Sequence, residues 1–202
     1  MFVSWSPSDP RSYSYLLGIY LGDGCLYVSR SGAAQLYIAC DAAQPKLVEA
    51  CAAAVALVAP GCHVGVHPIK GQRCIRVACT WRRWPEAFPQ HGPGRKHDRP
   101  IVLEPWQREI LDRYPREFLR GLIHSDGCRT INRFKTRLPS GRVAEYAYPR
   151  YFFSNLSADI RGLFCEYCER LGIRWTQSNP RNISVSHRNS VALLDSFVPA
   201  KS

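Results

Sequence analysis

One short segment occurs twice in this chain of 202 residues, and this repeat limits the possible folds more than any other feature. The first copy runs from Tyr15 to Cys25 and reads YLLGIYLGDGC; the second runs from Phe118 to Cys128 and reads FLRGLIHSDGC. Their aspartates lie 103 positions apart, about half the length of the chain. This spacing indicates two tandem copies of one structural unit.

The residues after each copy predict the same order of elements. Alternating and helical patterns in the first half predict strands at 25–30 and 35–40, a helix at 45–58, strands at 63–69 and 73–80, and a short helix from 81. The second half predicts strands at 129–136 and 146–154, a helix at 157–171 capped by Gly172, strands at 173–177 and 182–186, and a helix at 190–198. Each half therefore reads as an α+β unit of the order αββαββα.

Composition predicts where the two units join. Residues 89–105 are rich in Pro, Gly and charged residues, as is typical of a linker. We therefore divide the chain into a first half-domain at 1–88, a linker at 89–105 and a second half-domain at 106–202. Tandem halves of this kind imply one molecule with a pseudo-twofold axis and two antiparallel sheets.

The charge of the chain favours a polyanionic partner. Lys and Arg number 27 against 16 Asp and Glu, a formal net charge of +11, which indicates nucleic acid before membrane. Solubility alone needs less charge and no particular sign. The longest apolar stretch, 48–59, is too short to span a bilayer, and the first ten residues do not resemble a signal peptide. We expect a monomer without a membrane partner, located in the cytoplasm and associated with the nucleoid in a prokaryote.

The cysteines and two of the histidines do not indicate a metal site. Nine cysteines, an odd number, fit reduced thiols better than a disulfide framework. Cys165 and Cys168 lie within a helical pattern, and no second cysteine pair follows at zinc-finger spacing. His91 and His97 also lack a partner at suitable spacing, so we assign none of the four to metal.

Small residues recur at the same positions in both repeated segments. Gly18 and Gly22 are four residues apart, as are Gly121 and Ser125, so on a helix each pair forms one narrow stripe. A stripe without bulky side chains allows two helix backbones to approach closely. We therefore expect the two repeated helices to pack against each other, with their ends side by side.

This packing would bring two carboxylates together. Asp23 and Asp126 stand at the C-terminal ends of the helices, before Gly24 and Gly127, which suit a left-handed cap. The helix dipole disfavours a carboxylate there by ~0.3–1 kcal/mol, and the two charges repel each other. A divalent cation reverses this balance. Hard oxygen ligands favour Mg²⁺, with Mn²⁺ as a substitute, and such sites activate water toward phosphodiesters.

The segments Leu16–Gly24 and Leu119–Gly127 closely resemble the LAGLIDADG motif, and the elements after each match the half-domains of LAGLIDADG homing endonucleases. The resemblance covers nearly the whole chain. It implies an intron-encoded endonuclease that binds double-stranded DNA on a β-sheet saddle and cuts both strands across the minor groove. The target is then long and partly pseudo-symmetric.

The resemblance also implies roles for particular residues. We assign the metal to Asp23, Asp126, Gly22 and Ser125. The family places a basic residue near each active centre, and Lys96 is the best match, weighed evenly against a linker lysine that only touches phosphate. Lys201 holds a comparable place after the second half, but terminal lysines are commonly solvated. The sixth motif position, often acidic in the family, is Leu21 and His124 here, where we expect helix packing.

Residues that point outward from the strands are the candidates for DNA contact. In the third and fourth strands of each half one alternating set is apolar and the other polar, which predicts one covered and one wet face. The same alternation is counted from the two aspartates in the strands that follow them. The resulting candidates are Tyr27, Ser29, His63, His67, Arg76, Thr130, Asn132, Arg174, Thr176, Asn182, Ser184 and Ser186, and nearby donors for phosphate or guanine are Arg133, Lys135 and Arg150.

Two other functions remain open on the same fold. One is a DNA-binding regulator, like the bacterial sporulation regulators whose LAGLIDADG region has lost its acids; both aspartates are retained here. The other is a maturase that binds intron RNA, which nothing in the sequence excludes. An intein is disfavoured, because the chain lacks the terminal His-Asn splice signature.

Overall fold

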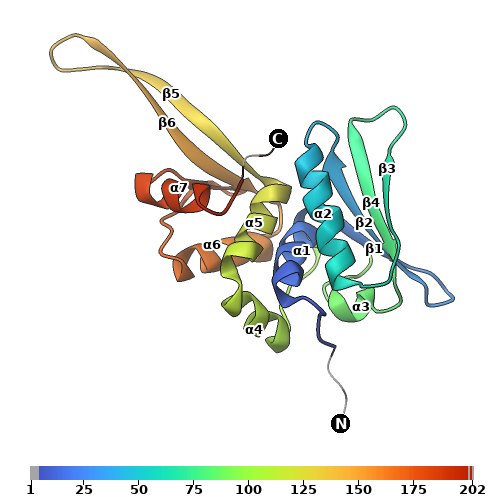
Figure 1. Cartoon of the computed structure of the whole chain (residues 1–202). Helices are drawn as coiled ribbons and strands as arrows, with labels where there is room; N and C mark the ends of the chain where they lie inside the picture. The colour runs from blue at the N-terminus through green and yellow to red at the C-terminus, as the bar shows by residue number, and fades with distance from the viewer. Residues whose placement is uncertain (1–4, 200, 202) are drawn as a thin grey trace.

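The computed structural model describes residues 5–199 and 201, which form two α+β halves around a central pair of helices (Figure 1). The first half contains α1 (Pro10–Asp23), β1 (Gly24–Val28), β2 (Ala34–Asp41), α2 (Pro45–Val58), β3 (Val64–Pro68), β4 (Cys74–Thr80) and α3 (Trp84–Ala87). The second contains α5 (Pro115–Asp126), β5 (Gly127–Arg137), β6 (Val143–Ser154), α6 (Ala158–Arg170), β7 (Thr176–Asn179), β8 (Asn182–Val185) and α7 (Arg188–Asp195). The predicted order αββαββα is confirmed in both halves.

Each half contributes one four-stranded antiparallel sheet with the same topology. The strand orders are β1-β2-β4-β3 and β5-β6-β8-β7. The first strand of each sheet begins at a glycine of equivalent register, since Gly24 pairs with Ile38 and Gly127 with Phe153. One sheet lies on each side of the α1–α5 pair, which confirms the pseudo-twofold arrangement (Figure 1).

The two motif helices pack with their backbones in contact. A Cβ on Gly18 would lie 2.5 Å from the carbonyl oxygen of Phe118 and 2.9 Å from the Cα of Gly121. A Cβ on Gly121 would overlap the carbonyl oxygen of Tyr15, also a backbone atom. Only glycine fits at this crossing, so the small-residue stripe acts as the sequence predicts.

The predicted left-handed caps after the two aspartates are wrong. Gly24 has φ −85° and Gly127 has φ −103°, so both are extended and begin the strands directly. Steric room explains the glycines instead: a Cβ would lie 2.6 Å from the Cα of Tyr20 at Gly24, and 2.7 Å from the Cα of Ile123 at Gly127. The chain leaves each helix too tightly for a side chain.

Several predicted boundaries also differ from the structure. The strand expected at 173–177 is β7 at Thr176–Asn179, and the last helix is α7 at Arg188–Asp195 rather than 190–198. The first two strands of the second half are longer than predicted, as β5 and β6 show. By contrast, Gly172 has φ +68° and its N–H donates to Glu169, as expected of the α6 cap.

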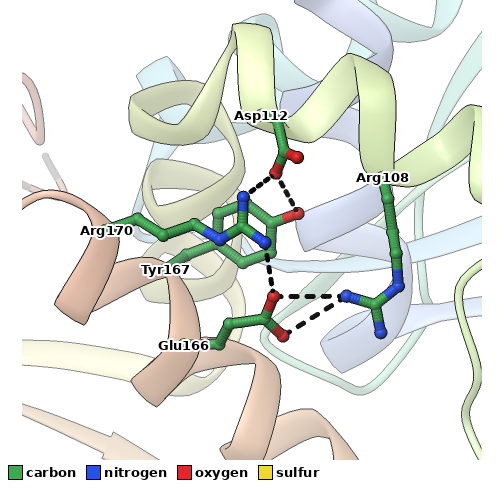
Figure 2. A network of polar contacts seen from close by, with 5 residues as sticks. All are labelled: Arg108, Asp112, Glu166, Tyr167 and Arg170. Atoms are coloured by element: carbon green, nitrogen blue, oxygen red, sulfur yellow. Dashed lines mark hydrogen bonds and ion pairs between the residues drawn. The ribbon is translucent and has the colours of Figure 1, made fainter.

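Between the halves lie the 3-10 turn η1 (Lys96–Asp98) and a helix, α4 (Pro105–Arg113), that the sequence patterns did not predict. Ion pairs hold α4 to α6 (Figure 2). Arg108 pairs with Glu166 at 3.2 Å, and Arg170 bridges Glu166, at 2.9 Å, and Asp112. The hydroxyl of Tyr167 donates to Asp112 at 3.2 Å. The connecting segment is thereby fixed to the second half.

A buried amide network fixes the same segment to the first half. The Nε2 atom of Gln107 on α4 donates to the Tyr13 hydroxyl on α1 at 2.7 Å, and that of Gln90 donates to Gln107 at 2.6 Å. The Tyr13 hydroxyl donates in turn to the carbonyl of Ala87 at 2.7 Å. Buried polar groups need such partners.

In the described part of the chain, no helix is long and apolar enough to cross a membrane.

The helix crossing predicts opposite effects for two glycine substitutions. Gly121→Ala should destabilise the protein by about 1–3 kcal/mol, because the new methyl meets rigid backbone. Gly162→Ala on α6, where none of the described residues beyond the adjacent helix backbone lies within 4 Å of a Cβ, should be neutral or stabilise by about 0.5–1 kcal/mol. Urea unfolding of both variants measures the difference. Equal effects would show that the α1–α5 crossing is looser than the structure indicates.

Candidate metal centre and nucleic-acid interface

The two motif aspartates are the last residues of α1 and α5 and lie where these helices meet. A Cβ on Gly22 would lie 2.7 Å from Oδ2 of Asp126, so the Asp126 carboxylate lies against the backbone of the other helix. Ser125 lies against Gly22 as well. The four residues assigned to the metal are therefore brought together by the helix crossing.

Both carboxylates are held in a setting that disfavours their charge. Partial burial, followed by repulsion from Asp126, raises the pKa of Asp23 to about 6, although Lys201 and Lys96 oppose the shift. Burial also raises the pKa of Asp126, while a hydrogen bond from the side chain of Asn155, at 2.6 Å, opposes this. A bound divalent cation would relieve both costs.

Lys96 reaches the C-terminal end of α1 from the connecting segment. Its Nζ donates to the carbonyl oxygens of Leu21 and Gly22, each at 3.1 Å, and of Tyr20. These carbonyls carry the negative end of the helix dipole. Burial lowers the pKa of Lys96 to about 8, against the pull of Asp126 and Asp23. An amine with this pKa can exchange a proton near neutral pH.

Lys201 makes the matching contact at the end of α5. Its Nζ donates to the carbonyl of Gly127 at 2.6 Å and to that of Ser125 at 3.4 Å. Burial lowers its pKa, and Asp23 is the strongest of the charges that oppose this. The structure therefore places Lys201 at the site, whereas the sequence left it as a solvated terminal lysine. Its spacing of 105 from Lys96, close to the repeat spacing, was the available signal.

The two halves of the site are similar but not identical. Asn155, absent from the sequence candidates, follows β6 and donates to Asp126. The sheet register places Cys40 at the corresponding position of the first half, near Asp23. Among the described residues, no side chain donates a hydrogen bond to Asp23. A hollow of about 450 Å³ lies beside Gly22, Lys96, Asp126 and Asn155, and Asp23 borders a separate one.

The donor set fits Mg²⁺ or Mn²⁺ better than a caged structural metal. Among the described residues, no group of three or more His, Cys, Asp or Glu side chains is placed to hold an ion. Two carboxylates and the neighbouring carbonyl oxygens are hard ligands, and Mg²⁺ commonly uses one or two carboxylates with water and substrate phosphate completing its shell. The site is thus suited to a cation that arrives with a phosphate ligand.

His124 is a packing residue in the structure. It is buried, its Nδ1 lies 2.9 Å from the Tyr15 hydroxyl of the other helix, and burial lowers its pKa to about 4. It is therefore neutral at neutral pH and faces the helix interface rather than the aspartates.

Each sheet has one face against helices and one free of them, and strand register assigns the candidates to faces. On β1, Tyr27 is 59% exposed and pairs with Gln35 on the free face. Thr130 and Asn132 take the equivalent places on β5, opposite Arg150 and Tyr148 on β6. Sequence reasoning missed Gln35, Tyr37 and Tyr148, because it did not follow the alternation along the second strand of each half.

Other candidates lie on the free face with differing access. His67 and Arg76 pair on β3 and β4, and both are exposed. Thr176 and Ser184 pair on β7 and β8, but Ser184 is buried, which limits contact with a ligand. The remaining candidates, at the ends of these strands or next to them, are Ser29, His63, Arg174, Asn182 and Ser186.

Arg133 and Lys135 lie on the opposite face of β5 from Asn132. Both are exposed, and they pair across the ladder with Ala147 and Glu145. Successive side chains along a strand point to opposite faces, and Arg133 and Lys135 are one and three residues away from Asn132. They do not join Thr130 and Asn132 in one row.

Comparison with known proteins supports the fold assignment. No protein-family model and no curated protein matches the chain. Full-length DUF199/WhiA from Thermatoga maritima matches with a TM-score of 0.60 at 14% identity, over 98% of this chain and 58% of that one. I-DmoI in complex with DNA and Mn matches with a TM-score of 0.59 at 14% identity, over 95% and 98%. The LAGLIDADG meganuclease I-AabMI bound to uncleaved DNA gives 0.58 at 12%, over 95% and 84%. The chain therefore has the LAGLIDADG homing endonuclease fold.

The raised pKa of Asp23 predicts a pH-dependent stability. Its folded pKa exceeds its ordinary value, so ionisation destabilises the metal-free protein above about pH 6, and this penalty fades as pH falls towards 4. Asp23→Asn should therefore raise the melting temperature in EDTA at pH 8 and do so less at pH 5. Solvent contact at Asp23 makes the gain modest.

Asp195 provides a control of opposite sign. Arg129 lowers the pKa of Asp195, so Asp195→Asn should reduce stability at pH 8, and this loss should shrink only as pH falls below about 4. Mg²⁺ should stabilise the wild type more than Asp23→Asn. A lower melting temperature for Asp23→Asn at pH 8 would contradict the electrostatics described for the site.

Proposed function

We propose that the protein is a site-specific endonuclease that hydrolyses both strands of duplex DNA with divalent metal held by Asp23 and Asp126. The observation that carries this proposal is the pairing of two carboxylates at a helix crossing, each helix end also bound by a half-buried lysine. A packing role alone does not favour two repelling acids with raised pKa values. Similarity in fold to proteins solved with DNA supports the choice of substrate.

The metal in this proposal is Mg²⁺, with Mn²⁺ able to substitute. Asp23 and Asp126, with the carbonyls of Gly22 and Ser125, would hold it. When bound, the ion would supply Lewis-acid activation of water and neutralise charge on the phosphate. I-DmoI, solved with Mn, supports a divalent ion.

The chain's own side chains would orient a metal-binding carboxylate and exchange protons at the site. Asn155 orients the Asp126 carboxylate and favours its ionised form. The Nζ of Lys96 exchanges a proton with water or stabilises negative charge on the phosphate, and Lys201 does the same for the other strand. The polar free faces of the sheets bind the DNA on both sides. One chain carries both motifs, so a monomer suffices.

A DNA-binding regulator without nuclease activity is the second candidate, favoured by the likeness to WhiA. Both functions use the same sheets, so DNA binding alone does not distinguish an endonuclease from a regulator. The aspartates separate them, because a regulator has no use for paired acids with raised pKa values.

Cleavage of a randomised duplex library tests the proposed activity. In Mg²⁺ or Mn²⁺ the protein should cut a small set of related sequences, and excess EDTA should abolish cutting. Asp23→Asn and Asp126→Asn should each lower the cleavage rate at least about 100-fold while DNA binding is retained. Glu49→Gln, at an exposed position on α2, should cut normally. Full cutting in EDTA, or by either Asp variant, would refute the mechanism, and binding without any cutting would favour the regulator.

Lys96 and Lys201 should act in the chemical step rather than in binding. Lys96→Ala and Lys201→Ala should each lower the single-turnover rate about 100- to 1,000-fold at saturating enzyme, with little change in Kd. Arg95→Ala, next to Lys96 but exposed, should weaken binding without a loss of rate. If both lysine variants change Kd but not the single-turnover rate, the two lysines are phosphate contacts and do not act in the chemical step.

A further inference from the structure

The first two strands of the second half form a much longer hairpin than those of the first. Strands β5 and β6 have 11 and 12 residues, whereas β1 and β2 have 5 and 8. At about 3.4 Å per residue, the extra 4 to 6 residues lengthen the hairpin by roughly 14–20 Å. Figure 1 shows this hairpin extending well past α7, the last helix beside it.

The charge of the two hairpins differs as strongly as their length. Residues 24–41 contain one Arg and one Asp, so the first hairpin has no net charge. Residues 127–154 contain six Lys and Arg and a single acid, Glu145, for a net charge of +5. Nearly half of the chain's excess positive charge therefore lies on one hairpin, which is complementary to a polyanion.

The front of the long hairpin continues the free face of the sheet. Beyond Asn132 it carries Phe134 opposite Tyr146, with Tyr148 beside them. The Phe134 and Tyr146 rings stack at 5.3 Å and remain 41% and 44% exposed. Such a cross-strand pair stiffens the ribbon. It also offers apolar contact to thymine methyl groups in a major groove wide enough for two strands.

The back of the hairpin carries cations beyond the reach of the helices. Arg129, near the base, pairs with Asp195 of α7 at 2.8 Å. Farther out, Arg133, Lys135 and Arg137 are exposed, and among the described residues only Lys135 of the three has an acidic partner, Glu145. A two-stranded ribbon without a covering layer is at best marginally stable in water. These long side chains can reach the phosphates that flank a groove holding the ribbon.

We propose that the distal β5–β6 hairpin, residues 131–149, is an arm that extends the DNA contact of the second half alone. The arm would make the bound site asymmetric, with contact about 4–6 base pairs longer on the side of the second half, at 3.4 Å per base pair. Its outer part holds the duplex mainly through phosphates. The inference rests on the proposed function only in taking duplex DNA as the ligand.

Footprinting of the full chain in Ca²⁺ tests the arm, on a duplex recovered as the bound fraction of a randomised library. The wild type should protect a longer stretch on one side of the central base pairs. A triple variant, Arg133→Gln with Lys135→Gln and Arg137→Gln, should lose protection at that outer end only. The slope of log K against log salt should become shallower by about 2–3, since each phosphate contact adds about −0.9.

A control variant removes the same charge from helices and turns outside both sheets. Lys46→Gln with Arg82→Gln and Arg113→Gln, all exposed positions, should change the salt slope by less than the value of about 0.9 for one phosphate contact. The footprint should stay unchanged. A symmetric wild-type footprint, or equal slope changes in the two triple variants, would overturn the arm and leave the endonuclease proposal standing. Absence of DNA binding by the wild type would overturn both.

Discussion

The close approach of α1 and α5 determines how the two halves are placed. Gly18 and Gly121 let the two backbones touch, and this sets the distance between the halves, the placement of the two sheets and the meeting of the helix ends. A methyl group at either position would push the helices apart. Because the aspartates end these helices, the same change would separate the carboxylates, so folding and site geometry share one steric requirement.

That requirement has an electrostatic consequence. Each helix end presents backbone carbonyls and a carboxylate. One lysine at each end, from the segment after each half, donates hydrogen bonds to these carbonyls. The lysines satisfy the carbonyls but leave the pKa of Asp23 at about 6. The two halves also diverge: Asn155 supports Asp126, Cys40 holds the equivalent place near Asp23, and only the second half has a long basic hairpin. The two copies of the repeated unit are thus unequal.

The sequence predicted what depends on local patterns and on the repeat. Periodicity gave the order of elements, and the small-residue stripe gave the helix crossing and the pairing of Asp23 with Asp126. It missed α4, a short helix in a segment rich in Pro and charge, whose position depends on ion pairs with α6. It missed Asn155 and undervalued Lys201, because their roles come from contacts between segments far apart in the chain. The sequence pattern predicted a left-handed cap at Gly24, but crowding against Tyr20 is what requires a glycine there.

If the crossing of α1 and α5 holds a divalent cation against DNA, radical chemistry at that ion will cut the chains around it. Replacing Mg²⁺ by Fe²⁺ and generating hydroxyl radicals at the bound ion maps its position directly. In the presence of duplex DNA, the protein backbone should be cut near Gly22–Gly24 and Ser125–Gly127, and the DNA near its central base pairs. These cuts should vanish in the double variant Asp23→Asn with Asp126→Asn. Backbone cuts elsewhere, or unchanged cuts in the double variant, would show that Asp23 and Asp126 do not hold the ion.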